Sequence, residues 1–363
     1  MTLILFLIVL AILVFVHEVG HFVAAKIARM RVDEFGIGFP PTIASVQKGE
    51  TKYALNIIPL GGYVKIFGES PSESEAGSLT DSRSFVSKNR GLQAMVLIAG
   101  ILFNMIFAWG LVSLGFMTGM PTASGGAPVT ELKNPRLLVI SLYPEGPAEI
   151  AGMKVGDELT FVGTPAESVA ALEPQPVREF ISSHPNEPIL FKVKRGEEIR
   201  DISIEPSTTL IGGQTVVGIS MDIVGIQKLA PHKAVIAGFA MTGDITVAVV
   251  KGIYGLIRDA ILGRADFSQV AGPVGIAGLV GDASRLGFAY LISFTALISI
   301  NLAVLNLVPF PALDGGRLLF VAIEAITRRK IPHKVANIAN TIGFSLLILL
   351  MIVITYKDII KLF

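Results

Sequence analysis

Long apolar runs separated by polar connections dominate the sequence. Four of the runs approach or exceed the roughly 20 residues with which an α-helix crosses the hydrocarbon core of a bilayer. They cover residues 3–25, 92–117, 288–311 and 335–355. The pattern predicts a polytopic α-helical membrane protein with four transmembrane helices.

A fifth apolar run, residues 234–257, is ambiguous because it contains Asp244, Lys251 and several threonines and glycines. It is long enough to cross a bilayer. A fifth crossing would, however, put the two basic stretches of the chain, residues 26–90 and 315–334, on opposite sides. We therefore interpret the run as an interfacial helix on the outer surface.

Positive charges predict the orientation of the chain. Lys and Arg are frequent in residues 26–90 and 315–334, and none precedes the first apolar run. The positive-inside rule puts both basic stretches in the cytoplasm. Both termini, and the long connection between the second and third runs, are then expected outside. The first run exceeds a signal-peptide core in length, so we expect a retained transmembrane helix and not a cleaved signal peptide.

Residues 33–68 are too polar for a transmembrane helix and contain short strand-like runs. Predicted strands cover residues 35–39, 53–58 and 63–66. Gly49-Glu50 and Gly61-Gly62 supply turns between them. This segment is expected to form a membrane-associated β-hairpin region. Residues 69–84, rich in Ser and Glu, are predicted to be a flexible loop.

Residues 121–225 are rich in acidic residues and prolines and are predicted to form a small soluble α+β domain. Strands are expected at residues 137–140, 159–162, 189–193, 202–204 and 216–219, and helices at residues 148–151 and 176–182. The segment from Pro144 to Leu159 resembles a PDZ domain of the bacterial protease type, because a small-residue turn, a short helix and a Gly-Asp turn lead into a strand. PDZ domains bind extended peptides at a sheet edge. A spacer domain without a ligand is the alternative.

Composition excludes several classes of protein. Hydrophobic residues make up 52% and charged residues 16%, with a mean hydropathy of +0.65, which excludes a soluble or disordered chain. The net charge of +1 offers no basic face for nucleic acid. The chain has no cysteine, so disulfides, thiolate metal ligands and cysteine nucleophiles are excluded.

The chemistry-bearing motif is His17-Glu18-Val19-Gly20-His21, an HExxH pattern inside the first apolar run. Histidines at i and i+4 share one helix face and can bind one zinc ion, while the glutamate beside them can act as a general base. A pair of core histidines is the alternative. Ionisable side chains inside a membrane segment are costly and usually functional, which favours the zinc site.

A catalytic zinc normally has three protein ligands. His184, His232 and His333 are poorly placed for the third position, so a carboxylate is expected. The candidates are Asp244, Asp314 and Glu324. Asp314 is favoured, because it follows two prolines that must break the third run, and it is expected at the same cytoplasmic depth as His17. Asp244 is expected on the outer side, and Glu324 has Arg328 as a possible ion-pair partner.

Together these motifs resemble the site-2 protease family of intramembrane zinc metalloproteases, and most of all its bacterial sigma-E-regulating branch. The resemblance rests on the HExxH motif, on residues 58–65 (IPLGGYVK), 272–277 (GPVGIA) and 306–316 (NLVPFPALDGG), and on the PDZ-like segment. It covers nearly the whole chain in the family's order.

The resemblance implies a role for each site residue. His17, His21 and Asp314 are expected to bind Zn²⁺, Glu18 to act as the catalytic base, and Asn306 to position the substrate backbone. The β-hairpin region is expected to present an edge to an unwound substrate helix. Two departures stand out: residues 99–104 (AGILFN) lack the proline that family members often have, and there is room for one PDZ domain instead of two.

The sequence therefore divides into two membrane halves at residues 1–119 and 286–363, a PDZ domain at 120–225 and an extracytoplasmic linker with the interfacial helix at 226–285. We expect a bacterial inner-membrane zinc endopeptidase that cuts single-span membrane proteins, such as anti-sigma factors or remnant signal peptides, within their transmembrane segments. The expected partners are these substrates, the lipid bilayer and a peptide or protein ligand of the PDZ domain. The alternatives are a membrane-anchored zinc protease acting on non-membrane segments, a zinc transporter and an inactive scaffold.

Overall fold

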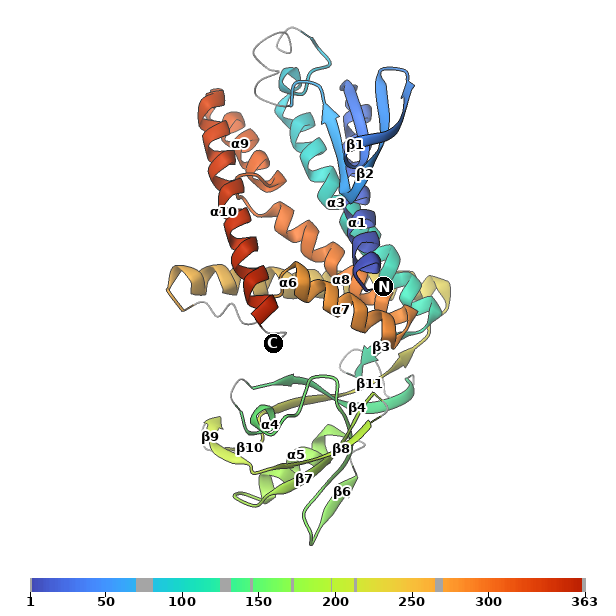
Figure 1. The fold of residues 1–363 in the computed structure, drawn as a ribbon, viewed down its shortest axis with the longest axis vertical. Helices are drawn as coiled ribbons and strands as arrows, with labels where there is room; N and C mark the ends of the chain where they lie inside the picture. Colours follow the sequence, from blue (N-terminus) through green and yellow to red (C-terminus); the bar gives the residue numbers. More distant parts are fainter. Residues whose placement is uncertain are drawn as a thin grey trace. The chain divides into compact units, whose positions relative to one another are not determined.

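The computed structural model describes residues 2–69, 81–124, 132–143, 146–170, 173–196, 198–211, 214–264 and 270–360. Most of the loop predicted at residues 69–84, and Pro144-Glu145 of the PDZ-like segment, lie outside the described residues. The chain folds as two compact units (Figure 1). Met1–Gly115 and Pro231–Phe363 form the membrane unit, and Phe116–Ala230 form the inserted unit.

Among the described residues, five helices are long and apolar enough to cross a bilayer, one more than predicted. They are α1 (Thr2–Ile27), α3 (Arg90–Thr118), α6 (Pro231–Ile261), α8 (Phe288–Leu307) and α10 (His333–Ile360). The additional one is α6, which contains the ambiguous run. The chain is thus a helical membrane protein, and the predicted count of four crossings stays a prediction.

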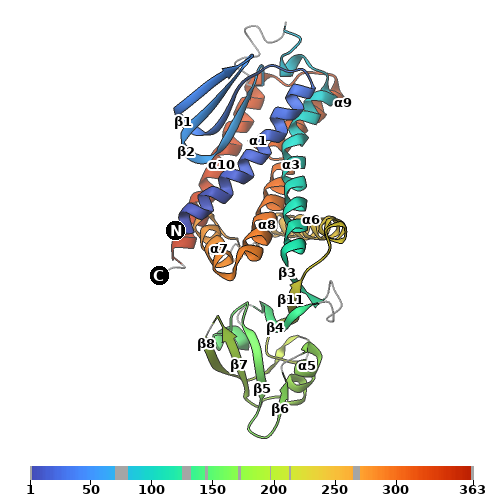
Figure 2. The same ribbon diagram turned by 90° about the vertical axis from the view of Figure 1, so that its right-hand side faces the viewer.

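Helix α6 runs crosswise to the other long helices of the membrane unit in both views (Figures 1 and 2). It packs against α3, where Trp109 Nε1 donates to the carbonyl of Val235 over 2.9 Å and Gly238 lies against Ser113. A small residue at Gly238 lets the two helix backbones approach closely.

Residues 226–285, predicted to be an extracytoplasmic linker with an interfacial helix, form mainly two helices, and their side of the membrane stays a prediction. Pro231 onwards belongs to the membrane unit, and helix α7 (Pro273–Leu286) packs against α1, α8 and α10. The start of α7 is held by α10, because Asp358 Oδ2 accepts the backbone N–H of Gly275 over 2.8 Å. The apolar and glycine-rich sequence of α7 fits this packing between helices.

The predicted β-hairpin region forms two long strands, β1 (Val32–Lys48) and β2 (Thr51–Ile66), joined at Gly49-Glu50 as expected. Strand β1 is longer than the strand predicted at residues 35–39, and β2 joins the two strands predicted at residues 53–58 and 63–66. Residues 34–37 pair with residues 62–65 and also with residues 52–55, so β2 folds around β1. The bend falls within β2 at Gly61, whose φ of 131° favours glycine. This sheet packs along α1.

Helix α8 ends at Leu307, four residues before the predicted end of the third span. The short helix α9 (Asp314–Thr327), which was not predicted, follows an unwound segment of residues 308–313. Glu324 on α9 pairs with Arg90 over 2.7 Å, so the predicted partner Arg328 is wrong. Helix α9 is amphipathic. From the sequence alone, these residues were interpreted only as part of a basic connection between two spans.

The inserted unit is an α+β domain, as predicted, with a sheet in the order β3-β11-β4-β5-β7-β8, in which β6 also pairs with β5. Its strands are β3 (Met120–Ala123), β4 (Lys133–Leu142), β5 (Glu158–Gly163), β6 (Ser168–Ala170), β7 (Ile189–Arg195), β8 (Glu198–Ile204), β9 (Ser207–Ile211), β10 (Gln214–Val216) and β11 (Ile219–Gln227). Its helices are α4 (Pro147–Ile150) and α5 (Pro174–Ser183). The strand predicted at residues 216–219 is wrong, because Gly218, at a φ of 80°, separates β10 from β11 there.

The Gly-Asp turn of the PDZ-like segment is stabilised by a buried ion pair. Asp157, 1% exposed, accepts bonds of 2.7 Å from both Nε and Nη2 of Arg195. It also accepts the backbone N–H of Lys154 over 2.9 Å. The hydrogen bonds between Asp157 and Arg195 raise the pKa of the Arg195 guanidinium. Asp157 of the motif therefore stabilises the connection between α4 and β5.

Candidate metal centre

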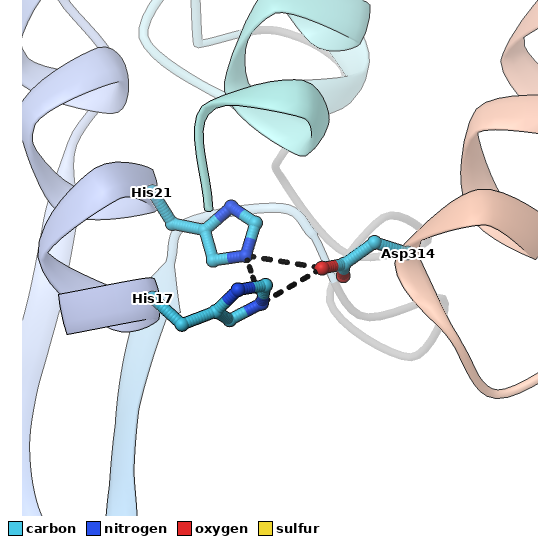
Figure 3. A group of neighbouring side chains, drawn as sticks. All are labelled: His17, His21 and Asp314. Carbon is cyan, nitrogen blue, oxygen red and sulfur yellow. Dashed lines mark hydrogen bonds and ion pairs between the residues drawn. The ribbon is translucent and has the colours of Figure 1, made fainter. Parts of the chain in front are cut away.

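His17, His21 and Asp314 converge on one point inside the membrane unit (Figure 3). Asp314 Oδ2 lies 2.9 Å from His17 Nε2 and 3.3 Å from His21 Nε2. The two Nε2 atoms are 3.0 Å apart. The histidines are one turn apart on α1, which puts both imidazoles on the same helix face. The structure thus brings together the three residues that the sequence predicted as metal ligands.

The unwound segment between α8 and α9 delivers Asp314 to this point. Pro309 and Pro311 cannot continue a helix, and Ala312 has a φ of 75°. Gly315 and Gly316 then start α9 directly against the carbonyls of Leu307, Val308 and Phe310, where a Cβ would overlap backbone atoms. The prolines and glycines of residues 306–316 therefore turn the chain sharply and place the carboxylate opposite α1.

Helix α3 passes behind the two histidines at a glycine. A Cβ on Gly100 would lie 2.5 Å from His21 Nε2 and 2.7 Å from His17 Cε1. Similarly, a Cβ on Gly20 would lie 2.5 Å from the carbonyl of Ala99. The sequence analysis noted residues 99–104 only for a missing proline. The signal that it missed is the small-residue pair at Ala99-Gly100, which is typical of close helix crossings in membranes.

Helix α3 also contacts the far side of both imidazoles. His21 Nδ1 lies 2.8 Å from the carbonyl of Val96, and His17 Nδ1 lies 3.5 Å from Asn104 Nδ2. A carbonyl behind a histidine fixes the tautomer in which Nδ1 carries the proton and Nε2 is free to bind a metal.

Glu18 and Asn306 line a cavity of about 230 Å³ next to this centre. Its other walls include Val14, Asn104 and the turn at Ala312 and Leu313, together with His17, Leu302 and Asp314. Strand β2 passes close to it, because a Cβ on Gly62 would lie 3.7 Å from Glu18 Cγ. The predicted base and the predicted positioning residue therefore share one small space with two of the predicted ligands.

The three side chains have the donor set and the spacing of a zinc site. Two imidazole nitrogens and one carboxylate oxygen suit Zn²⁺, and ligand atoms at about 2.0–2.2 Å from one tetrahedral zinc lie roughly 3.4 Å apart. The observed separations of 2.9, 3.0 and 3.3 Å are close to this value. Gly100 also leaves room for the two imidazoles beside α3. The residues present therefore fit zinc.

The other candidate ligands lie elsewhere. Glu324 is paired with Arg90, and Asp244 is on α6. His184 belongs to the inserted unit, where its Nδ1 lies 2.8 Å from the carbonyl of Phe180. Within the described part of the chain, only His17, His21 and Asp314 form a group of at least three potential ligands.

Comparison with known proteins identifies the family. Residues 5–350 match peptidase family M50. A Clostridium perfringens relative is 35% identical over 96% of this chain and 95% of its own length. The zinc metalloprotease RasP of Oceanobacillus iheyensis is 30% identical over 100% of this chain and 99% of RasP, and RasP of Geobacillus kaustophilus is 29% identical over 99% and 97%. The chain therefore belongs to peptidase family M50, the site-2 protease family that its motifs resemble.

Proposed function

We propose that this chain is an intramembrane zinc endopeptidase with His17, His21 and Asp314 as zinc ligands and Glu18 as its catalytic base. Its family and its relatives make it a zinc metalloprotease. The observation that carries the residue assignment is the meeting of two imidazoles and a carboxylate beside Glu18, among apolar helices.

The chemistry follows from these positions. Zinc bound here supplies Lewis-acid polarisation of the scissile carbonyl and makes water a stronger nucleophile. The Glu18 carboxylate takes a proton from the attacking water and delivers it to the amide nitrogen as the C–N bond breaks. The Asn306 amide, on another wall of the cavity, donates a hydrogen bond to the substrate backbone and holds it in register.

The proposed substrates are single-span membrane proteins, including anti-sigma factors and remnant signal peptides, cut within the apolar segment. A helical peptide bond is shielded by its own backbone hydrogen bonds, so the substrate must be extended before attack. Strand β2 passes Glu18 at Gly62, which puts extended backbone beside the cavity. This supports a role for the sheet in holding the substrate open by strand pairing.

The proposed location is the bacterial inner membrane, with both termini and the inserted unit outside and the catalytic centre towards the cytoplasm. Two observations within the membrane unit support it. The start of α1 and the end of α10 lie at the same end of the membrane unit, and α9 lies at the opposite end, in both views (Figures 1 and 2). The crosswise direction of α6 supports an interfacial position instead of a fifth crossing.

The inserted unit is proposed to bind an extended peptide or protein segment in the PDZ manner. A groove of about 930 Å³ runs between α5 and β11, lined by Arg178, Ser182, Ile219 and Met221 among others. In the described residues, Ile219–Ile223 of β11 pair with β4 on one side, and the groove lies along the first three of these residues. An added strand fits there. We expect Ser182→Trp to block peptide binding and Ser203→Trp, outside the groove, to leave it unchanged in fluorescence polarisation.

The decisive experiment measures cleavage and zinc content together. Purified full chain in detergent is incubated with a single-span substrate, and Glu18→Gln is compared with wild type. The matched control is Glu198→Gln, the same change at a side chain that is 70% exposed in the inserted unit. We expect Glu18→Gln to keep one zinc per chain and to lose at least about a hundredfold in rate, because a general base contributes about 10²–10⁴-fold.

The surface protease and the zinc transporter each have their own outcome in this experiment. Cleavage only outside the apolar segment of the substrate would favour the surface protease. Bound zinc without cleavage, followed by zinc flux in liposomes, would favour the transporter. Full activity of Glu18→Gln would contradict the proposed base.

A further inference from the structure

Asn104 is a fully buried amide directly behind the metal centre. The residue is 0% exposed, on α3. Its Nδ2 lies 3.5 Å from His17 Nδ1, and its main-chain carbonyl accepts the hydroxyl of Ser299 over 2.8 Å. Among the described residues, no donor reaches Asn104 Oδ1. A buried amide oxygen without a partner is costly, so this atom requires an explanation.

The protonation state of His17 supplies the explanation. His17 Nε2 faces Asp314 and His21, so it is the nitrogen that points towards the metal position. A neutral imidazole that binds metal through Nε2 carries its proton on Nδ1, which is then a donor. As drawn, this donor faces the NH₂ group of Asn104, which is also a donor. Two donors cannot form a hydrogen bond.

Turning the Asn104 amide by 180° resolves the conflict at His17 and gives the amide oxygen a partner. The oxygen and nitrogen of an amide are assigned from the hydrogen-bond network and are nearly indistinguishable in shape. In the turned orientation Oδ1 accepts Nδ1–H of His17, and the oxygen gains the partner that it lacked. The NH₂ group then takes the buried place that Oδ1 held, on the side of Asn104 away from His17.

The position of Asn104 on α3 supports this orientation. Val96, Gly100 and Asn104 are spaced four residues apart and therefore form one stripe along the helix. Val96 offers its carbonyl to His21 Nδ1 over 2.8 Å, and Gly100 contacts both rings. Asn104 then offers an acceptor to His17 Nδ1, as Val96 does to His21 Nδ1. Each imidazole has an acceptor behind it and Asp314 in front.

We propose that Asn104 is a positioning residue that accepts Nδ1–H of His17 through Oδ1 and so fixes the tautomer and orientation in which His17 binds zinc. The inference rests on the proposed function, specifically on His17 as a zinc ligand. Asn104 acts through His17 and does not need to touch the reacting atoms. Its loss is expected to weaken zinc binding itself, before any effect on catalysis.

The test compares Asn104→Leu with Asn104→Asp in the full chain. Leucine has nearly the same size and suits a membrane helix, but it offers no acceptor. Aspartate is unfavourable in a membrane helix, but it keeps the acceptor. Zinc affinity is measured by competition with a chelator in detergent, on protein that is monodisperse in size-exclusion chromatography. We expect zinc affinity to fall about 10–100-fold in Asn104→Leu and to stay within about threefold of wild type in Asn104→Asp.

A purely structural role for Asn104 predicts the reverse order, with Asn104→Leu at least as tight as wild type, and that result would overturn the proposal. Ser299→Ala is the matched control, because it removes the neighbouring bond to the Asn104 main chain and leaves the amide intact; we expect unchanged zinc affinity. If Ser299→Ala weakens zinc as much as Asn104→Leu, general loosening of α3 is the cause and the inference fails. If wild type binds no zinc, the proposed function fails instead.

Discussion

At the scale of single residues, the metal centre depends on missing side chains as much as on its ligands. His17 and His21 reach Asp314 because α3 crosses α1 at glycines, with Gly20 against Ala99 and Gly100 against both rings. A methyl group at either glycine would occupy space that backbone or imidazole already fills. The HExxH pattern predicts two of the three proposed ligands, but nothing in it predicts which helix packs against them.

Gly100→Ala is therefore predicted to weaken zinc binding about tenfold or more, because its Cβ would lie 2.5 Å from His21 Nε2 and would force the rings to move. Gly110→Ala is the matched control on the same helix, since a Cβ there meets nothing within 4 Å. The control should bind zinc like wild type and be equally or slightly more stable, because alanine favours helix. Zinc competition measures the first effect and thermal unfolding in detergent the second. Equal zinc affinity in all three proteins would contradict the crossing seen here.

At the scale of elements, the break between α8 and α9 is the feature that brings Asp314 to the two histidines of α1. Unwound backbone at membrane depth is tolerated where it lines a cavity, and residues 312–314 do line one. Helix α10 supports the break: Asn340 Oδ1 accepts the N–H of Ala312 over 3.3 Å, and Gly343 lies against Pro311. The two prolines made the break predictable from the sequence. Helix α10 was predicted only as a transmembrane helix, and its contacts with the break were not predicted.

Gly316→Ala tests the geometry of this break. The new methyl group would overlap the carbonyl of Phe310 and push α9 away from the unwound segment that carries Asp314. A displacement of about 1 Å at a catalytic group can cost about a hundredfold in rate, so we expect kcat/KM to fall by roughly that factor. The control, Gly278→Ala on α7, meets nothing within 4 Å and should be neutral. Unchanged cleavage by Gly316→Ala would show that the break has freedom to adjust.

At the scale of the whole molecule, the chain forms a membrane unit and an inserted unit. The predicted limits of 120 and 225 fall within a few residues of Phe116 and Ala230. These limits could be predicted because a soluble domain and a membrane segment differ in composition over many residues. The role of residues 231–286 was not readable, because an apolar helix that lies along a membrane surface and one that crosses it share length and composition.

The membrane topology can be measured directly, because the chain contains no cysteine. Single cysteines at Glu187 and Lys330 are expected on opposite sides, so that an impermeant maleimide labels Glu187→Cys in intact spheroplasts and Lys330→Cys only after lysis. Lys233→Cys and Arg264→Cys bracket α6, and both should be labelled from outside. Labelling of these two from opposite sides would show that α6 crosses the membrane.

The sequence by itself determined the family, the membrane character, the zinc ligands to test and the presence of an α+β segment. Each of these depends on short motifs of neighbouring residues or on composition averaged over long stretches. The tertiary structure decided what depends on residues far apart. Val96, Gly100 and Asn104 lie behind His17 and His21, β2 passes Glu18, and α10 supports the broken helix. These contacts depend on the fit between surfaces of elements that are far apart in the chain, and a small-residue pair such as Ala99-Gly100 indicates a close crossing without naming the partner helix.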